Sequence, residues 1–117
     1  MKVQLSERAG AKIVSCAQPI TSVDDALALI ASCIENDSQL LLLDGEQLPP
    51  AFFELRSRFA GEFVQKLANY RLRVAAYFVS GPERSERFEE FLREARRGRD
   101  FRAFTSREDA EIWLVSA

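Results

Sequence analysis

Apolar residues recur along the chain with two alternating periods, and these periods predict the order of its elements. Alternating apolar residues at 2–5 and 12–16 predict two antiparallel strands, joined by a loop of several residues that ends at Gly10. Three later apolar runs predict further strands, at residues 40–43, 72–79 and 101–105. The run at 40–43 is uninterrupted, which is typical of a strand covered on both faces, so we expect it at the centre of the sheet.

Spacings of three and four between apolar residues predict a helix before each of these three strands and one after the last. The first helix has Ser22 as its expected N-cap. Its apolar face is expected to be buried and consists of Val23, Ala26, Leu27, Ile30, Cys33 and Ile34. The second begins near Ser57, and the third lies within residues 83–98. The last follows Ser106, which with Asp109 resembles a capping box.

The predicted order is therefore strand, strand, helix, strand, helix, strand, helix, strand, helix (ββαβαβαβα). Alternation after the opening hairpin predicts parallel strands joined by right-handed crossovers. The chain of 117 residues is long enough for one hydrophobic core and shows no internal repeat or linker. We expect a single α/β domain over residues 1–117, with a mixed, mostly parallel sheet.

Composition narrows the functional classes. The chain contains no His, which excludes His-assisted catalysis and His-bearing zinc sites. Cys16 and Cys33 lie in apolar patterns and are expected to be buried, reduced thiols. A formal net charge of -2 argues against general binding to polyanions. No apolar run approaches membrane-spanning length and the N-terminus lacks a signal-peptide pattern, so we expect a cytoplasmic protein. We also expect no cofactor and no metal.

The element order, and the spacing from the run LLLLD to the helix after Ser57, resemble the STAS domain of sporulation anti-sigma-factor antagonists. In that family the turn before the second helix bears a phosphorylatable serine, preceded by an aspartate and followed by a small residue and a glycine. Ser57 matches the serine, whereas Arg56, Arg58 and Phe59 depart from the neighbouring positions. The resemblance implies a STAS-like topology.

Two stretches are similar to a bacterial family of domains of unknown function, numbered 4180. They are LPPAFFELRSRFAGEFVQKLANYRLRVA at residues 48–75 and FLREARRGRDF at residues 91–101. The second departs from the family pattern at Arg96, where an Asn is expected. The family has no established activity, so this resemblance implies membership and a set of positions but no mechanism.

The turn at Ser57 is the first candidate site. A serine at a helix N-terminus commonly acts as the N-cap by accepting a backbone hydrogen bond. Alternatively, a phosphate on Ser57 would be stabilised by the helix dipole and by the guanidinium groups of Arg56 and Arg58. Under this second hypothesis the turn is a phosphorylation or anion-binding site.

The outward face and the exit of the second helix form the second candidate site, which we call the recognition edge. Its residues are Gly61, Glu62, Gln65, Lys66, Asn69, Tyr70 and Arg71. Ordinary solvation and helix termination explain several of the polar ones. Gly61 needs a further reason, because glycine within a helix costs about 1 kcal/mol relative to alanine. Either the helix packs tightly against its neighbour at Gly61, or a partner or ligand reaches the backbone there.

A secondary basic cluster follows near the end of the third helix and consists of Arg93, Arg96, Arg97 and Arg99, with Arg102 beyond it. Clustered arginines can neutralise phosphates. Here Glu94 and Asp100 are interleaved with them and no stacking aromatic is evident, so a solvated helix end explains them better than binding to nucleic acid. The candidate acids and bases show no spacing that indicates a reaction, and they are Asp44, Glu46, Glu54, Glu62 and Glu94.

These patterns favour a non-catalytic regulatory module that binds another protein. A second hypothesis is a small-ligand or nucleotide-binding domain that uses the mouth between the strand ends and the Ser57 turn. A third is an enzyme in which Glu62 acts with Arg71 or Arg97. An exposed hairpin edge would also suit a symmetric homodimer, and no membrane partner is expected.

Overall fold

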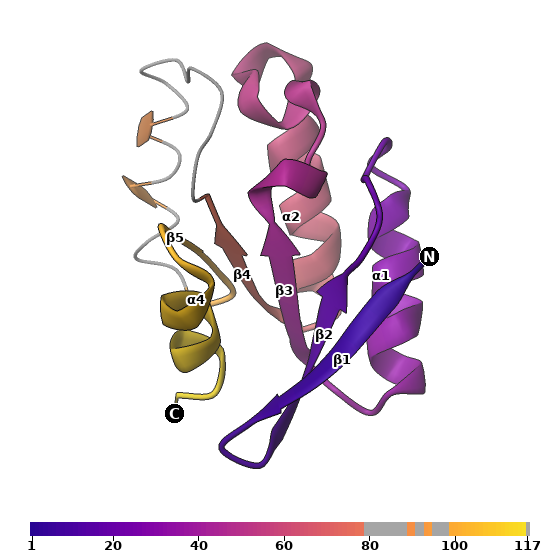
Figure 1. The fold of residues 1–117 in the computed structure, drawn as a ribbon. Coiled ribbons are helices and arrows are strands. Elements are labelled where there is room, and N and C mark those ends of the chain that lie inside the picture. Colours follow the sequence, from indigo (N-terminus) through magenta and orange to yellow (C-terminus); the bar gives the residue numbers. More distant parts are fainter. Residues whose placement is uncertain (79–88, 91–92, 95–98, 117) are drawn as a thin grey trace.

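The computed structural model describes residues 1–78, 89–90, 93–94 and 99–116. Within them five strands form one mixed sheet, in the order β1-β2-β3-β4-β5 (Figure 1). The strands are β1 (Val3–Arg8), β2 (Ala11–Cys16), β3 (Leu40–Asp44), β4 (Arg73–Tyr77) and β5 (Phe101–Phe104). β1 is antiparallel to β2, and every later pair of neighbours is parallel. The predicted α/β class, the opening hairpin and the central position of residues 40–43 are confirmed.

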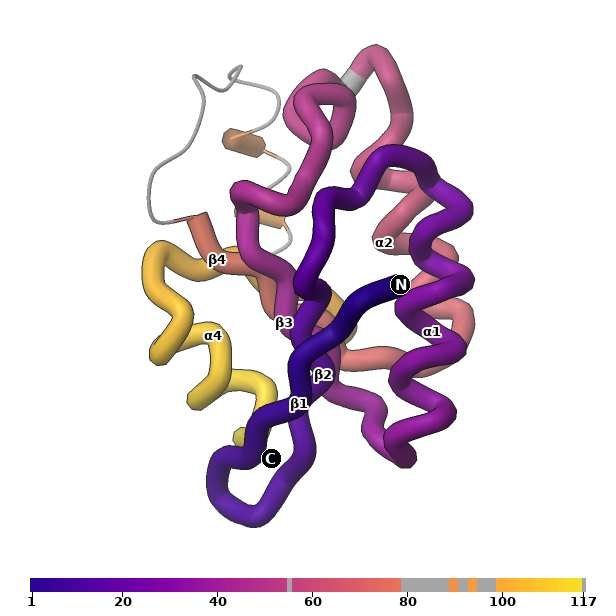
Figure 2. The backbone as a smooth tube through the Cα atoms, turned by 45° about the vertical axis from the view of Figure 1, so that its right-hand side comes forward, coloured from indigo at the N-terminus to yellow at the C-terminus, as the bar shows by residue number. Residues whose placement is uncertain are grey.

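The hairpin turn is shorter than predicted. Arg8 pairs with Ala11, which leaves a loop of two residues, Ala9 and Gly10. Both have positive φ, at 53° and 80°, which gives the turn the twist that suits a two-residue hairpin. The predicted loop of several residues was wrong because the polar residues before Ala9 continue the first strand. Figure 2 shows the hairpin turn near the C-terminus, and an ion pair of 3.6 Å joins Arg8 to Glu111 there.

Helices cover both faces of the sheet. α1 (Asp25–Glu35) and α2 (Phe59–Asn69) lie on one face, and α4 (Arg107–Leu114) lies on the other (Figure 1). Alternate residues of β3 therefore enter different cores, because Leu41 and Leu43 pack on the side of α1 and α2 while Leu42 packs against α4. This burial on both faces explains why residues 40–43 are apolar without interruption.

Aromatic contacts fix the segment between β3 and α2. The chain makes three 3-10 turns here, at Gly45–Gln47, Pro50–Phe53 and Leu55–Ser57. The second turn places Phe52 and Phe53 in the core. Phe53 meets Phe78 edge-on at a ring-centroid distance of 5.9 Å, and Phe52 meets Phe59 at 6.4 Å. These contacts attach the turns to the end of β4 and to the start of α2.

Local hydrogen bonds decide where two helices begin. α1 begins at Asp25 and not directly after Ser22, so the expected cap at Ser22 was wrong. Instead the Asp25 carboxylate accepts the backbone N–H groups of Thr21 and Ser22, at 2.8 and 3.2 Å. α4 begins as predicted, because the Ser106 hydroxyl accepts the N–H of Asp109 at 3.2 Å.

Two apolar residues of α1 lie outside the core, contrary to prediction. Leu27 is 47% exposed and Ile34 is 67% exposed, because the rest of the chain covers a narrower stripe of α1 than the apolar pattern offers. The third predicted helix lies largely outside the described residues. In the described part of the chain, no helix combines the length and the apolar character needed to cross a bilayer.

Candidate functional site

The Ser57 turn is held by hydrogen bonds to the hydroxyl of Ser57 itself. This hydroxyl lies within donating distance of the carbonyl oxygen of Ala51 and, at 2.7 Å, of the carbonyl oxygen of Glu54. The same oxygen accepts the N–H of Phe59, the first residue of α2, at 3.1 Å. The N-cap position belongs to Arg58, whose backbone is left-handed with a φ of 61°. The predicted N-cap at Ser57 was therefore wrong by one residue, although its hydroxyl still satisfies a helical N–H.

Arg56, Ser57 and Arg58 are all exposed at this turn. Among the described residues, neither arginine forms a side-chain hydrogen bond or ion pair. The two guanidinium groups and the helix dipole favour an anion at this end of α2, whereas the exposed carboxylates of Glu54 and Glu62 nearby oppose one.

Five residues of the recognition edge share the outer face of α2. Gly61, Glu62, Gln65 and Asn69 are exposed, and Lys66 is half-buried. All but Asn69 line a surface depression of about 560 Å³. Gln65 Nε2 donates to Asn69 Oδ1 at 2.8 Å, one turn further along the helix. The structure thus brings these five predicted residues together on one surface.

Nothing in the described part of the chain requires Gly61 to be glycine. A Cβ at this position would meet no atom of the described residues within 4 Å, outside its own helix and its chain neighbours. Its φ is not positive, so the backbone conformation does not require glycine either. Tight packing against one of the described helices, the first explanation that the sequence offered, is therefore not observed. The alternative that the sequence left open is a partner or ligand that approaches the backbone of α2.

Tyr70 and Arg71 leave this surface at the exit of α2. Tyr70 is the C-cap residue of the helix, and Arg71 has a left-handed backbone with a φ of 59°. The sequence placed both residues at the exit of the helix, and the chain turns there, after Asn69. Tyr70 is 55% exposed and lines a different cavity.

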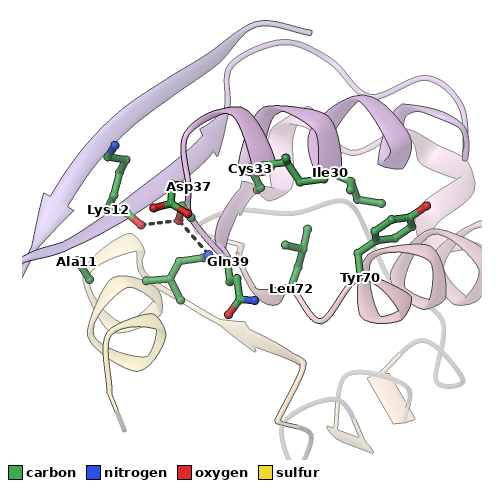
Figure 3. A pocket seen from close by; sticks show the side chains of 11 residues that line it. Ala11, Lys12, Ile30, Cys33, Asp37, Gln39, Tyr70 and Leu72 are labelled. Carbon is green, nitrogen blue, oxygen red and sulfur yellow. Dashed lines mark hydrogen bonds between the residues drawn. The ribbon is translucent and has the colours of Figure 1, made fainter.

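This different cavity, which we call the basal cavity, lies where α1 and α2 end and where β2 and β3 begin (Figure 3). Its volume is about 620 Å³. The residues that line it include Lys12, Ile30, Cys33, Asp37, Gln39, Tyr70 and Leu72. Figure 3 shows Tyr70 at one end and Lys12 and Asp37 towards the other. The ligand hypothesis drawn from the sequence concerned the opposite edge of the sheet, near the Ser57 turn.

The candidate acids and bases are dispersed. Asp44, at the carboxyl end of β3, accepts a hydrogen bond from the Tyr77 hydroxyl at 3.2 Å. Burial, reinforced by the nearby Asp44 carboxylate, raises the pKa of Tyr77. Glu62 lies in the first turn of α2 and Arg71 lies beyond its end, so roughly 13 Å of helix separates them. Arg97 lies outside the described residues. This separation removes support from the hypothesis of a Glu62–Arg71 pair.

The secondary basic cluster is only partly described. Arg93 and Arg99 are exposed, whereas Arg96 and Arg97 lie outside the described residues. Arg102 is half-buried, and its guanidinium lies 5.4 Å from the centre of the indole ring of α4. Arg102 therefore packs beside α4, on one face of the sheet.

Both thiols are buried and free, as predicted. Burial raises the pKa of Cys16 and of Cys33, in the second case to about 11. A protonated thiol is a poor nucleophile and a poor metal ligand, so the two residues act as small core side chains. Within the described ranges, no group of three or more His, Cys, Asp or Glu residues is arranged to hold a metal ion.

The model of a family described as domain of unknown function (DUF4180) matches residues 6–114. This range begins within β1 and ends with α4. The chain belongs to the DUF4180 family. No curated protein matches it. In this DUF4180 domain the Ser57 turn, the recognition edge and the basal cavity all lie within the matched range.

Sequence reasoning missed the basal cavity of this DUF4180 domain. Ile30, Cys33 and Ile34 were assigned to the core by their helical spacing, and Asp37 resembled an ordinary turn residue. One signal of a further apolar surface was present in the sequence. The apolar stripe of α1 is wider than a helix needs to cover a sheet. Nothing in the spacing connects this stripe with Tyr70, which comes from the end of α2.

Proposed function

We propose that this DUF4180 domain is a non-catalytic regulatory module that binds another protein chain through the outer face of α2. The observation that carries the proposal is Gly61. A glycine in an exposed helix costs about 1 kcal/mol relative to alanine. Within the residues that the structure describes, neither packing nor backbone conformation requires this glycine. Close approach of a partner's main chain is a contact that glycine permits and a Cβ would obstruct.

The side chains beside Gly61 suit recognition of a peptide group. Gln65 and Asn69 use one amide N–H and one carbonyl oxygen in their mutual hydrogen bond. The carbonyl oxygen of Gln65 and the amide group of Asn69 keep further hydrogen-bonding capacity, one helical turn apart. They can accept from and donate to a main-chain amide of the partner. Charges of opposite sign on Glu62 and Lys66 would help to orient that partner.

The regulatory part of the proposal rests on the turn that opens α2. The element order resembles that of STAS domains, whose serine at the corresponding turn is phosphorylated. A phosphate on Ser57 would disturb the hydroxyl's hydrogen bonds to Glu54 and Phe59 and place negative charge beside Arg56 and Arg58. The start of α2 would then shift just before Gly61. Phosphorylation would thereby alter the face that we assign to the partner.

Affinity purification from the native host tests the interface, with the wild-type domain and two variants. Gly61→Ala adds one methyl group to the outer face of α2, and Glu35→Ala changes an exposed residue of α1 outside that face. We expect Gly61→Ala to raise the unfolding free energy by about 1 kcal/mol and to abolish capture of a protein that wild type and Glu35→Ala retain. Because the variant is more stable, lost capture cannot be due to unfolding. Equal capture by all three proteins would refute the interface.

The amide pair has its own test in the double variant Gln65→Ala, Asn69→Ala. We expect it to lose the same partner that Gly61→Ala loses, because both changes affect one surface. Quantitative mass spectrometry of the captured proteins measures the loss. Unchanged capture would remove the amide pair from the interface.

Intact-mass analysis of protein purified from its native host tests the regulatory part. We expect a fraction of the chains to carry one phosphoryl group on Ser57, absent from a Ser57→Ala variant. An unmodified Ser57 under every growth condition would contradict phosphorylation without affecting the proposed interface.

A further inference from the structure

We propose that the basal cavity binds a free α-amino acid with an aromatic or branched apolar side chain. The cavity lies away from the outer face of α2, and Tyr70 is the residue of the recognition edge that takes part in it. Its volume of about 620 Å³ falls within the range of small-molecule sites. The inference rests on three features of its lining, namely an apolar middle, exposed apolar walls and two opposite charges.

The middle of the cavity is apolar. Ile30, Cys33 and Leu72 line the cavity and belong to the larger core, where they are 3%, 0% and 3% exposed. Burial raises the pKa of the Cys33 thiol to about 11, so this side chain stays neutral under ordinary conditions. An apolar ligand side chain that contacts these residues would be removed from water, which favours binding.

The walls supply apolar surface that the chain itself leaves open. Ile34 and Tyr70 are the two most exposed large hydrophobic side chains among the described residues, and both line this cavity. Figure 3 shows the Tyr70 ring at one end of it. An aromatic ligand ring can pack on the tyrosine in an offset or edge-on arrangement. Binding would therefore cover surface that is otherwise exposed to water.

Two opposite charges complete the lining. Lys12 lies near the start of β2, and Asp37 follows the end of α1. Among the described contacts, neither side chain forms a hydrogen bond or an ion pair, with the other or elsewhere. Unpaired opposite charges beside one cavity suit a zwitterion, whose ammonium and carboxylate groups can each form a charge-assisted hydrogen bond.

These features define one orientation for the ligand. Its ammonium group lies at Asp37, where the negative end of the α1 dipole also favours a cation. Its carboxylate lies at Lys12, and its side chain extends across Cys33 towards Tyr70. Amino acids with short or charged side chains would leave the apolar middle uncovered or would bury a charge there.

Calorimetric titration of the whole chain with L-leucine and with three phenyl compounds tests the chemistry of the ligand. L-phenylalanine carries both charges, 2-phenylethylamine carries only the ammonium group, and 3-phenylpropionate carries only the carboxylate. We expect phenylalanine to bind at least about tenfold more tightly than either analogue, because each analogue leaves one charged side chain without its partner. An analogue that binds as tightly as phenylalanine, or no saturable binding of phenylalanine and leucine at millimolar concentration, would overturn the proposal.

Variants locate the site. Asp37 has a left-handed backbone with a φ of 51°, which asparagine adopts readily, so Asp37→Asn keeps the fold. We expect it to weaken phenylalanine binding about tenfold. Glu35→Gln removes the same charge from an exposed neighbouring position that does not line the cavity, and it should leave the affinity within about twofold. An unchanged affinity in Asp37→Asn would overturn the site. The titration needs no protein partner, so its result is independent of the proposed interface on α2.

Discussion

Gly45 and Gly61 show that two glycines of one chain can have different reasons for being there. Gly45 begins the 3-10 turn after β3, where a Cβ would fall against the Phe78 ring and 2.9 Å from the carbonyl oxygen of Tyr77. Gly61 lies in α2, where a Cβ would meet none of the described atoms within 4 Å beyond its own helix and chain neighbours. Folding therefore explains the first glycine and not the second. This difference between the two glycines is the reason that we assign the interface to α2.

Gly45→Ala is expected to lower the unfolding free energy by about 1–3 kcal/mol, because the carbonyl oxygen cannot move aside without disturbing β4. Gly61→Ala is the matched control, since it adds the same methyl group and should raise the unfolding free energy. Chemical denaturation of both variants beside the wild type measures the two changes. A loss of stability in Gly61→Ala would contradict our account of that position.

At the scale of elements, the start of α1 depends on one carboxylate. Asp25 accepts the N–H groups of Thr21 and Ser22, whereas Asp24 occupies the N-cap position without a side-chain hydrogen bond. Both carboxylates lie near the positive end of the helix dipole, so the two residues differ mainly in these hydrogen bonds. The polar residues around the start of α1 predicted a helix start. The hydrogen bonds show that Asp25 is the residue that stabilises it.

Asp25→Ala is therefore expected to cost about 1 kcal/mol more than Asp24→Ala. The reason is that only the first change leaves two backbone N–H groups without their acceptor. Thermal unfolding followed by circular dichroism compares the two variants directly. Equal losses would mean that the helix dipole, and not the hydrogen bonds, stabilises this end of α1.

At the scale of the whole molecule, folding keeps several ionisable groups neutral. Cys16 and Cys33 lie in the larger core, and Tyr77 packs beside the smaller one under α4. Burial raises the pKa of all three groups. Each of them therefore holds its proton more tightly in the folded chain than in the unfolded chain, which makes the stability of the fold depend on pH.

Stability is expected to fall as the pH rises on the alkaline side. Below the ordinary thiol pKa of 9.0, Cys33 is protonated in both states, so its contribution is fully present. Between there and its folded pKa of about 11, the unfolded chain releases a proton that the folded chain keeps, and the unfolding free energy decreases. The loss through Cys33 alone is on the order of 2–3 kcal/mol. Cys16 and Tyr77 add to it in the same direction.

Denaturant unfolding at several pH values between about pH 8 and pH 11 measures this loss. Cys33→Ala is the comparison, because it removes the titrating thiol. Lost packing should make this variant less stable near neutral pH, yet its stability should depend less steeply on pH. An identical pH dependence in the two proteins would exclude Cys33 as a source of the effect.

The candidate surface on α2 could be predicted in part. Helical spacing alone placed Gln65, Lys66 and Asn69 along one edge, and the structure places them on the outer face of α2. Tyr70 was placed at the exit of the helix, and it lies there, but it lines a different cavity because α2 ends at Asn69. The N-cap of α2 was misplaced because Arg58 has a left-handed backbone, which cannot be predicted from its residue type.

By itself the sequence determined the α/β class, the order of the elements, the two buried thiols and the outer face of α2, because each follows from periodicity over a few neighbouring residues. Only the tertiary structure decided that no described residue packs against Gly61, that Gly45 lies against Phe78, and that the basal cavity exists. The residues around that cavity are far apart in the chain. Because β2 and β3 are parallel, both strands start at the same edge of the sheet. The helices that connect parallel strands end at this edge too, and so Lys12, Asp37 and Tyr70 line one cavity.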